Sequence, residues 1–373
     1  MPVKDRLVSW YIKKILIPGQ QEIDEPGFLT KEMKGAEFNR DVLLPESIFI
    51  NIEEAADTEN AKSSLYGVGK SFGYRLATIS NLTQFDGENE KKFKRFADFF
   101  VKYIESTYSA GMEYEIDLGD KLFQLQAEDY VVCRESGSGQ ILGSGGIAGI
   151  WSYMMQDSSI EGAHTQCEGR GEESCKFVCA PEAYLENLGA DAFSSEIDGE
   201  KVEPSNDYES YNRVRETTYA QNSLQDLLDV GFFDYQGGKI SHKDDRHILC
   251  DTGLPYLLGE VMAANHDENM LFESAFSYGK SLAGREQDRE PEQFITEYLS
   301  ATGWGDTKIR EKDGGYEVTA YLFPWTKFWE ETSFPLYRGL VSGLLSGFKD
   351  REVRLENVEK DTKGRGFTVK VSE

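Results

Sequence analysis

Cys167-Glu-Gly-Arg-Gly-Glu-Glu-Ser-Cys175-Lys-Phe177 is a stretch in which two thiols flank a glycine-containing turn, with His164 just upstream. Its glycines permit the positive φ angles that a tight reversal needs. We therefore predict that the segments on either side, 160–166 and 175–180, pair as an antiparallel hairpin and that the turn brings the two thiols together. Thiolate and imidazole are ligands that suit zinc, so this corner is a candidate metal site. The alternative is a pair of buried thiols beside an exposed histidine.

The composition limits the classes of partner. The chain has 373 residues, which suggests about two domains, and a formal net charge of −26. The acidic residues are spread along the chain, so nucleic acid and anionic membrane surfaces are poor partners, because binding them needs a concentrated basic surface. A large negative charge usually keeps a protein soluble, and it would also suit a cytoplasm rich in salt.

The sequence predicts neither export nor a membrane span. Basic residues interrupt the apolar positions of 1–16, so this segment lacks the apolar core of a signal peptide. No segment approaches the roughly 20 apolar residues of a transmembrane helix. A cytoplasmic location is therefore expected, and the 5 cysteines are interpreted as reduced thiols or metal ligands.

Internal similarity between the two halves indicates a duplication. The segment Tyr-Gly-Val-Gly-Lys-Ser-Phe over 66–72 recurs as Phe-Ser-Tyr-Gly-Lys-Ser-Leu over 276–282. Glycines four apart occur in the apolar helical patterns of both 145–152 and 339–346. Small residues at this spacing lie on one helix face and let the helix approach a neighbour closely.

An α+β protein of two tandem units, 1–185 and 211–373, is the predicted fold. The segment between them, 186–210, is rich in Ser, Asp, Glu and Gly and is expected to be a linker. Each unit should hold an antiparallel sheet packed against helices, because no regular alternation of strands and helices is visible. In the second unit two opening strands are expected over 230–250, followed by a helix over 254–264.

The glycine-rich helix followed directly by the cysteine hairpin resembles the 4-vinyl reductase domain family. The resemblance covers 27–180 and, less closely, 230–371. The residues that carry it are Gly69, Gly145, Gly149, Cys167, Gly171, Cys175 and Phe177, and then Gly238, Gly279, Gly339 and Gly343. It implies two tandem units with a fold like that of the vesicle-trafficking (TRAPP) complex subunits, an apolar pocket between helices and sheet, and small-molecule binding.

The resemblance also implies one zinc ion in the first unit. In the aromatic-sensing members of the family three cysteines and a glutamate hold zinc; the last two cysteines correspond to Cys167 and Cys175, and the glutamate falls on His164. The remaining cysteine would fall near Gln140, where this chain has none. The hairpin of the second unit, 353–371, has no cysteine and is expected to bind no metal.

Three candidates remain for the fourth zinc ligand. Cys133, at the end of the preceding strand, is one, and we include it in the predicted metal site. Cys179 is another, if its strand twists. A water molecule would leave the open position that catalytic zinc uses.

Aromatic residues gather where the family places its pocket. The candidate pocket residues are Phe99, Phe100, Tyr103 and Trp151 in the first unit and Trp304, Phe323 and Trp325 in the second. An aromatic-lined cavity for a flat or hydrocarbon ligand is one interpretation, and ordinary core packing is the other.

We therefore expect a protein that binds or senses an apolar or aromatic small molecule and carries a structural zinc hairpin. No nucleophile elbow, catalytic triad or dinucleotide motif is present, so an enzyme is not favoured. Two alternatives are an enzyme or accessory protein acting on a tetrapyrrole or vinyl substrate, and an interaction scaffold like the trafficking subunits. The two units are expected to pair within the chain or in a homodimer.

Overall fold

The computed structural model describes residues 21–33, 36–134, 136, 140–190, 192–197, 217–265, 267–312, 315–324, 332–361 and 366–371. This part of the chain has an α+β fold in which three antiparallel sheets pack against helices, and the predicted fold class is confirmed. The longer part of the predicted linker, 198–210, lies outside the described residues.

The two outer sheets have the same topology. Their strand orders are β4-β5-β7-β6 in the first half and β11-β12-β14-β13 in the second. The first-half strands are β4 (Gly111–Asp117), β5 (Leu122–Glu128), β6 (Ile160–Gln166) and β7 (Cys175–Pro181). The second-half strands are β11 (Asp306–Lys312), β12 (Gly315–Tyr321), β13 (Leu355–Asp361) and β14 (Gly366–Val371). The repeated order supports the inferred duplication.

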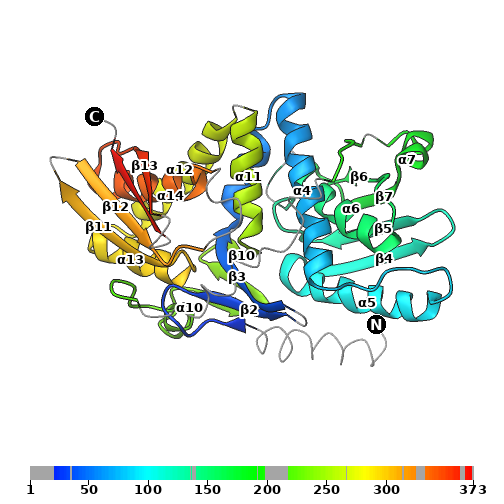
Figure 1. Ribbon diagram of the computed structural model, residues 1–373, viewed down its shortest axis with the longest axis horizontal. Helices are drawn as coiled ribbons and strands as arrows, with labels where there is room; N and C mark the ends of the chain where they lie inside the picture. The colour runs from blue at the N-terminus through cyan, green and yellow to red at the C-terminus, as the bar shows by residue number, and fades with distance from the viewer. Residues whose placement is uncertain are drawn as a thin grey trace.

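A third sheet joins the two halves at the centre of the molecule (Figure 1), with the strand order β1-β2-β3-β10-β9-β8. Its strands are β1 (Gln21–Glu22), β2 (Leu29–Met33), β3 (Ala36–Pro45), β8 (Asp234–Gln236), β9 (Lys239–His242) and β10 (Asp245–Asp251). β3 and β10 pair antiparallel, from Asp41 opposite Asp251 to Pro45 opposite His247. The run Val42, Leu43 and Leu44 is buried throughout, as expected for a strand covered on both faces.

Apart from the last helix of the first half and the first helix of the second, the described helices follow the same repeated order. Those of the first half are α3 (Glu46–Ala55), α4 (Glu59–Ile79), α5 (Glu90–Tyr108), α6 (Ile141–Met155) and α7 (Glu182–Leu188). Those of the second half are α10 (Leu224–Asp229), α11 (Gly253–Ala264), α12 (Glu268–Arg285), α13 (Pro291–Ala301) and α14 (Pro335–Lys349). None of the helices in the described segments is long and apolar enough to cross a membrane.

The opening elements of each half pack on the body of the other half. Helix α3 contacts α12, and α11 contacts α4. In Figure 1, α11 and α4 stand side by side above the central sheet, with the outer sheets on either side. The two halves therefore pair within one chain, and each half is incomplete without the other.

Close helix pairs form the body of each half, α4 with α6 and α12 with α14. A Cβ at Gly149 would lie 1.9 Å from the Lys70 carbonyl oxygen, and one at Gly343 would lie 2.1 Å from that of Phe276. The close contact between helices that the glycines four apart predict is therefore present in both halves. No larger residue fits at these positions without separating the helices.

Candidate metal centre and apolar cavity

The hairpin predicted from the cysteine-flanked turn is present. β6 and β7 pair antiparallel, and a β-bulge just after His164 bends β6 before the turn. A short 3₁₀ turn (η2, Glu168–Arg170) is followed by Gly171 with a φ of +90°, in the left-handed region. The reversal brings Cys167 and Cys175 together at its base.

Cys133 reaches this hairpin because the chain turns sharply after β5. Asp129 and Val132 have φ angles of +51° and +70°, which is unusual for a β-branched residue such as valine. Glu46, at the start of α3, accepts the Val132 N–H at 2.5 Å and holds this conformation. The Cys133 sulfur then lies 3.9 Å from Nε2 of His164.

Close packing fixes the hairpin against this turn. A Cβ at Gly169 would lie 2.0 Å from the Ser136 carbonyl oxygen and 2.4 Å from that of Cys133. Gly169 is therefore needed for close approach, whereas Gly171 is needed for its positive φ.

Four side chains form a candidate metal centre. The thiols of Cys133, Cys167 and Cys175 and a ring nitrogen of His164 all lie within 4.8 Å of one another. Neighbouring ligands of a tetrahedral zinc with bonds near 2.3 Å are about 3.8 Å apart, so shifts of about 1 Å would suffice to hold the ion. The three cysteines are fully buried, and the His164 ring stacks on Phe177 at 4.3 Å. This group could bind a metal such as zinc.

Of the fourth ligands that the sequence left open, the structure brings Cys133 to the other three. Cys179 is buried farther along β7, opposite Gly162. Burial and the nearby Glu161 carboxylate raise the pKa of the Cys179 thiol. Cys179 is therefore a neutral thiol in the core and is not part of the cluster.

Two of these side chains have shifted pKa values that favour the protonation state in which they bind a metal ion. A hydrogen bond from Cys133 lowers the pKa of the Cys167 thiol to about 6 against the effect of burial, and the N–H groups of Gly169 and Arg170 lower it further. Burial lowers the pKa of His164 to about 4, with a further lowering by Arg170. At neutral pH the chain thus offers a thiolate at Cys167 and a neutral imidazole at His164, the forms that bind metal ions.

Metal binding at His164 requires a change of ring tautomer. The Gln140 N–H donates to Nδ1 at 3.2 Å, so the neutral ring carries its proton on Nε2, the nitrogen that faces the Cys133 thiol. A metal bond at Nε2 requires the ring proton on Nδ1, and the Gln140 contact would then be lost. The backbone of Gln166 hydrogen-bonds to the ring and raises the pKa of His164, so it offers an acceptor of the kind that metal-bound histidines use.

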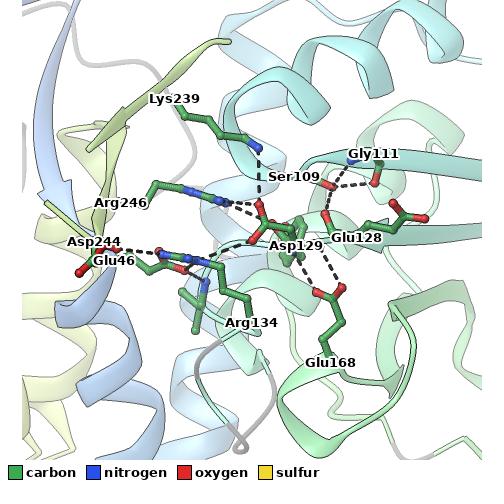
Figure 2. A network of polar contacts seen from close by, with 12 residues as sticks. Glu46, Ser109, Gly111, Glu128, Asp129, Arg134, Glu168, Lys239, Asp244 and Arg246 are labelled. Atoms are coloured by element: carbon green, nitrogen blue, oxygen red, sulfur yellow. Dashed lines mark hydrogen bonds and ion pairs between the residues drawn. The ribbon is translucent and has the colours of Figure 1, made fainter. Parts of the chain in front are cut away.

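A polar network holds the turn that carries Cys133 (Figure 2). Both oxygens of Glu168 accept backbone N–H groups, from Asp129 at 2.9 Å and from Tyr130 at 3.3 Å. Arg246, from β10 of the second half, donates to the Asp129 carboxylate at 2.6 Å. Arg134 forms a two-pronged ion pair with Glu46. The position of Cys133 therefore depends on the hairpin, on α3 and on the second half.

An apolar cavity of about 240 Å³ lies between α4, α5 and α6 of the first half and β10 and α11 of the second. Phe72, Leu76, Ile147, Ile150 and Leu254 are among the residues that line it. A second space of about 30 Å³ shares some of its walls. A cavity of about 150 Å³ is enough for benzene, so the larger space suits a substituted ring or a short hydrocarbon.

The cavity and the metal centre share a wall. Tyr130, Val131, Val132 and Gln140 all line the cavity. The first three directly precede Cys133 in the chain, and the Gln140 side-chain oxygen lies 3.9 Å from the Cys133 sulfur. Any movement of Cys133 would therefore change the shape of the cavity.

The predicted pocket residues of the first unit lie in different places. Phe100 and Tyr103 line the cavity, and Trp151 lines the adjoining smaller space with Phe100. Phe99 is 38% exposed and lies on the outer surface of α5. Its expected place in the pocket is corrected: the exposure puts Phe99 at the solvent side of α5, whereas Phe100 faces the cavity.

The corresponding region of the second unit is filled by its own aromatic rings. Phe323 lies 4.7 Å from Phe367, 5.2 Å from Tyr337 and 5.7 Å from Trp304 between ring centroids. In the described part of this unit, Trp304 and Phe323 line a space of only about 20 Å³. Trp325, the remaining predicted pocket residue, lies outside the described residues.

Comparison with known proteins adds little to this geometry. A scan against models of protein families gives no match, and a search of curated proteins gives none either. Among solved structures, the phenol-responsive sensory domain of the transcription activator PoxR with phenol is similar to this chain at 16% sequence identity. The match covers 51% of this chain and 98% of that chain, with a TM-score of 0.36. A superposition this loose supports no argument, and membership of the 4-vinyl reductase domain family stays a prediction.

Several residues of the site were not predicted from the sequence. Glu168, Glu46 and Arg246 position the turn of Cys133, yet each is a charged residue of the kind that usually faces solvent. Arg246 could have been found by aligning the two halves, because Arg40 occupies the matching place in β3. Glu168 and Glu46 carry no comparable signal.

Proposed function

We propose that the first unit binds an apolar or aromatic small molecule, and that a structural zinc ion holds one wall of the cavity in place. Cys133, His164, Cys167 and Cys175 are the zinc ligands. The second unit closes the cavity with its opening strands and serves as a scaffold. We place the two units at 1–185 and 211–373.

The wall shared by the metal cluster and the cavity carries this proposal. Tyr130, Val131 and Val132 line the cavity, and the next residue, Cys133, belongs to the ligand set. A metal bond to Cys133 would hold the left-handed conformation of Val132 and with it the form of the cavity. The cavity is also mostly apolar and large enough for a monocyclic compound, as small-molecule sites usually are.

Native mass spectrometry of the chain purified without chelator, compared with the denatured mass, tests both parts. We expect one zinc ion per chain and, in a fraction of molecules, a small apolar adduct. Chelation should lower the melting temperature, because metal binding stabilises the folded state. A bare mass, reactive thiols and a melting temperature unaffected by zinc would overturn the zinc assignment.

Two matched variants separate the metal from general packing. Cys175 and Cys179 both lie fully buried in β7. Cys175→Ser should abolish zinc binding and lower the free energy of unfolding by about 3 kcal/mol. Cys179→Ser should keep one zinc per chain, and loss of zinc from both variants would show that the assay reports folding alone.

A further inference from the structure

We infer that copies of this chain associate head to tail, with the edge strand β4 of one copy pairing with the edge strand β11 of the next. This association concerns the outer sheets and depends on neither zinc nor a ligand. It follows from the matching positions of the two strands and from the opposite charges of their outward side chains.

β4 and β11 are equivalent edge strands of the two outer sheets. Each stands first in the order of its sheet, so within the described residues it has a neighbouring strand on one side only. The two sheets lie on opposite sides of the molecule (Figure 1), so β4 and β11 of one chain do not meet. The free side of an edge strand presents N–H and C=O groups that can pair with a strand of another chain.

The outward face of β4 is acidic. One face of this strand packs against the core through Met112, Tyr114 and Ile116. Successive side chains of a strand point to opposite faces. The residues that alternate with the apolar ones therefore point away from the core, and all three are exposed: Glu113, Glu115 and Asp117.

The outward face of β11 is basic at the same three positions of the strand. Thr307 is buried and Ile309 packs against the core. The alternate residues therefore point outward, and they are Lys308, Arg310 and Lys312. A row of three cations at one edge of a chain with a formal net charge of −26 is a surface suited to an acidic partner.

Two charges of each row are free to meet a partner chain. Asp117 accepts the N–H of Gly119 at 2.8 Å, and Lys308 donates to the Tyr219 hydroxyl at 2.7 Å. The other two members of each row form no ion pair within the described part of the chain. Glu317 is directly opposite Arg310 in β12, but its ion pair, at 3.9 Å, is with Lys370 of β14.

The edge of β4 is open along most of its length. At its start, the Met112 N–H already donates to the Glu105 carboxylate of α5 at 3.2 Å. The charged residues all come after this position, over 113–117. Pairing over these residues leaves the contact between Met112 and Glu105 in place.

Antiparallel pairing of β4 with β11 of another copy places opposite charges across from each other. With Glu115 opposite Arg310, Glu113 lies opposite Lys312, and Asp117 lies opposite Lys308. Opposite charges in such cross-strand pairs attract, whereas like charges directly opposite each other destabilise the pairing. Two β4 strands or two β11 strands would therefore repel. The charges disfavour both symmetric dimers and favour the head-to-tail contact, which leaves one free edge at each end and can extend.

Sedimentation equilibrium of the full chain at about 0.1 M salt tests the inference. Charges still interact over about 10 Å under these conditions, which exceeds the roughly 5 Å between neighbouring strands. We expect the weight-average mass to rise with protein concentration and to exceed that of two chains. A mass that stays at one chain up to about 1 mM protein would overturn the inference, and so would a mass that stops at two chains.

Two charge-reversed variants identify the surface. Glu113→Lys with Glu115→Lys makes both edges mainly basic, and Arg310→Glu with Lys312→Glu makes both mainly acidic. Each variant alone should associate at least about tenfold more weakly than the parent. An equimolar mixture of the two should associate again, because every basic edge then finds an acidic one. A mixture that does not associate would overturn the assignment to β4 and β11.

The control changes the net charge by the same amount elsewhere. Glu54→Lys with Asp57→Lys alters two exposed acidic residues near the end of α3. This variant should associate at least as well as the parent, because it lowers the overall repulsion between copies. Weakening equal to that of Glu113→Lys with Glu115→Lys would overturn the role of the strand. Thermal unfolding establishes that each variant is folded, and the result for the parent stands without the variants.

Discussion

Arg40 and Arg246 make the same contact in opposite directions across the centre of the molecule. Nη1 of Arg40 donates to the Leu322 carbonyl, and Nη1 of Arg246 donates to the Asp129 carbonyl, each at 3.1 Å. Leu322 and Asp129 each follow the second strand of an outer sheet, with φ angles of +49° and +51°. Each half is therefore closed by an arginine from the opening strands of the other half.

Replacement of Glu168 by Gln should weaken metal binding without removing a metal ligand. Both carboxylate oxygens of Glu168 accept backbone N–H groups from the turn that carries Cys133, and glutamine has one acceptor oxygen. We expect zinc affinity, measured by competition with a chromophoric chelator, to fall about tenfold to a hundredfold, as for other outer-shell partners. The control is Glu173→Gln, which alters an exposed residue of the same turn. Equal zinc affinity in the Glu168→Gln and Glu173→Gln variants would show that Glu168 does not position the turn of Cys133 for metal binding.

The stability of the protein should depend on pH through Glu53. Burial raises the pKa of Glu53 from 4.5 to about 7, although the N–H groups of Leu142 and Ile141 oppose this shift. The folded chain thus binds this proton more tightly than the unfolded chain. The contribution is full below pH 4.5 and is lost as the pH rises through 7, which amounts to about 3 kcal/mol.

Urea unfolding of Glu53→Gln and of the unaltered protein at several pH values checks this expectation. The stability of the variant relative to the parent should rise by about 3 kcal/mol between pH 4.5 and 8. Glu54→Gln, an exposed neighbour on the same helix, should show no such trend. Parallel pH profiles for Glu53→Gln and its parent would contradict a buried, protonated Glu53.

Replacing an aliphatic residue by phenylalanine at matching positions of the two units should have different effects on stability. Ile147 of α6 lines the cavity, whereas Val341, at the matching position of α14, is fully buried in the aromatic-rich core. Ile147→Phe should be tolerated and should block ligand binding, because the ring occupies the cavity. Val341→Phe should lower the free energy of unfolding by about 1–3 kcal/mol through overpacking. Thermal unfolding and ligand titration measure both effects, and equal destabilisation would mean that the cavity is closed in solution.

Neighbouring glycines of α6 should differ sharply in their tolerance of alanine. A Cβ at Gly149 would meet the Lys70 carbonyl oxygen at 1.9 Å, whereas the nearest atom to a Cβ at Gly146 is 3.8 Å away. Gly149→Ala should lower the free energy of unfolding by about 2–4 kcal/mol, because the helices must separate. Gly146→Ala should be neutral or stabilise by up to about 1 kcal/mol through helix propensity. Denaturant unfolding of both variants is the measurement, and a harmless Gly149→Ala would place α4 and α6 farther apart.

Local structure was predictable because its causes are local. The hairpin 160–181 follows from the glycines between its two cysteines, and the paired helices follow from glycines four apart. The metal cluster was predictable as far as His164, Cys167 and Cys175. Cys133 was one option among three, because two left-handed residues decide where the chain returns after β5, and neither is a glycine.

The sequence did not predict that the opening elements of each half pack on the other half. The apolar run in β3 indicates a buried strand, but it does not indicate which half of the chain covers that strand. Since the halves are similar, the opening elements would fit either one. The choice depends on contacts between distant charged groups, such as Arg246 with Asp129, which look solvated when the sequence is considered alone.

Because β3 and β10 meet within one chain, the molecule has the architecture of a dimer without its genetic symmetry. In a homodimer every substitution occurs twice, so a metal site or a cavity must be kept or lost in both copies. Here a substitution in one half leaves the amino-acid sequence of the other half unaltered. The two halves can therefore differ inside: the second is filled by phenylalanine and tyrosine rings, whereas the first has a cavity and a cluster of cysteines.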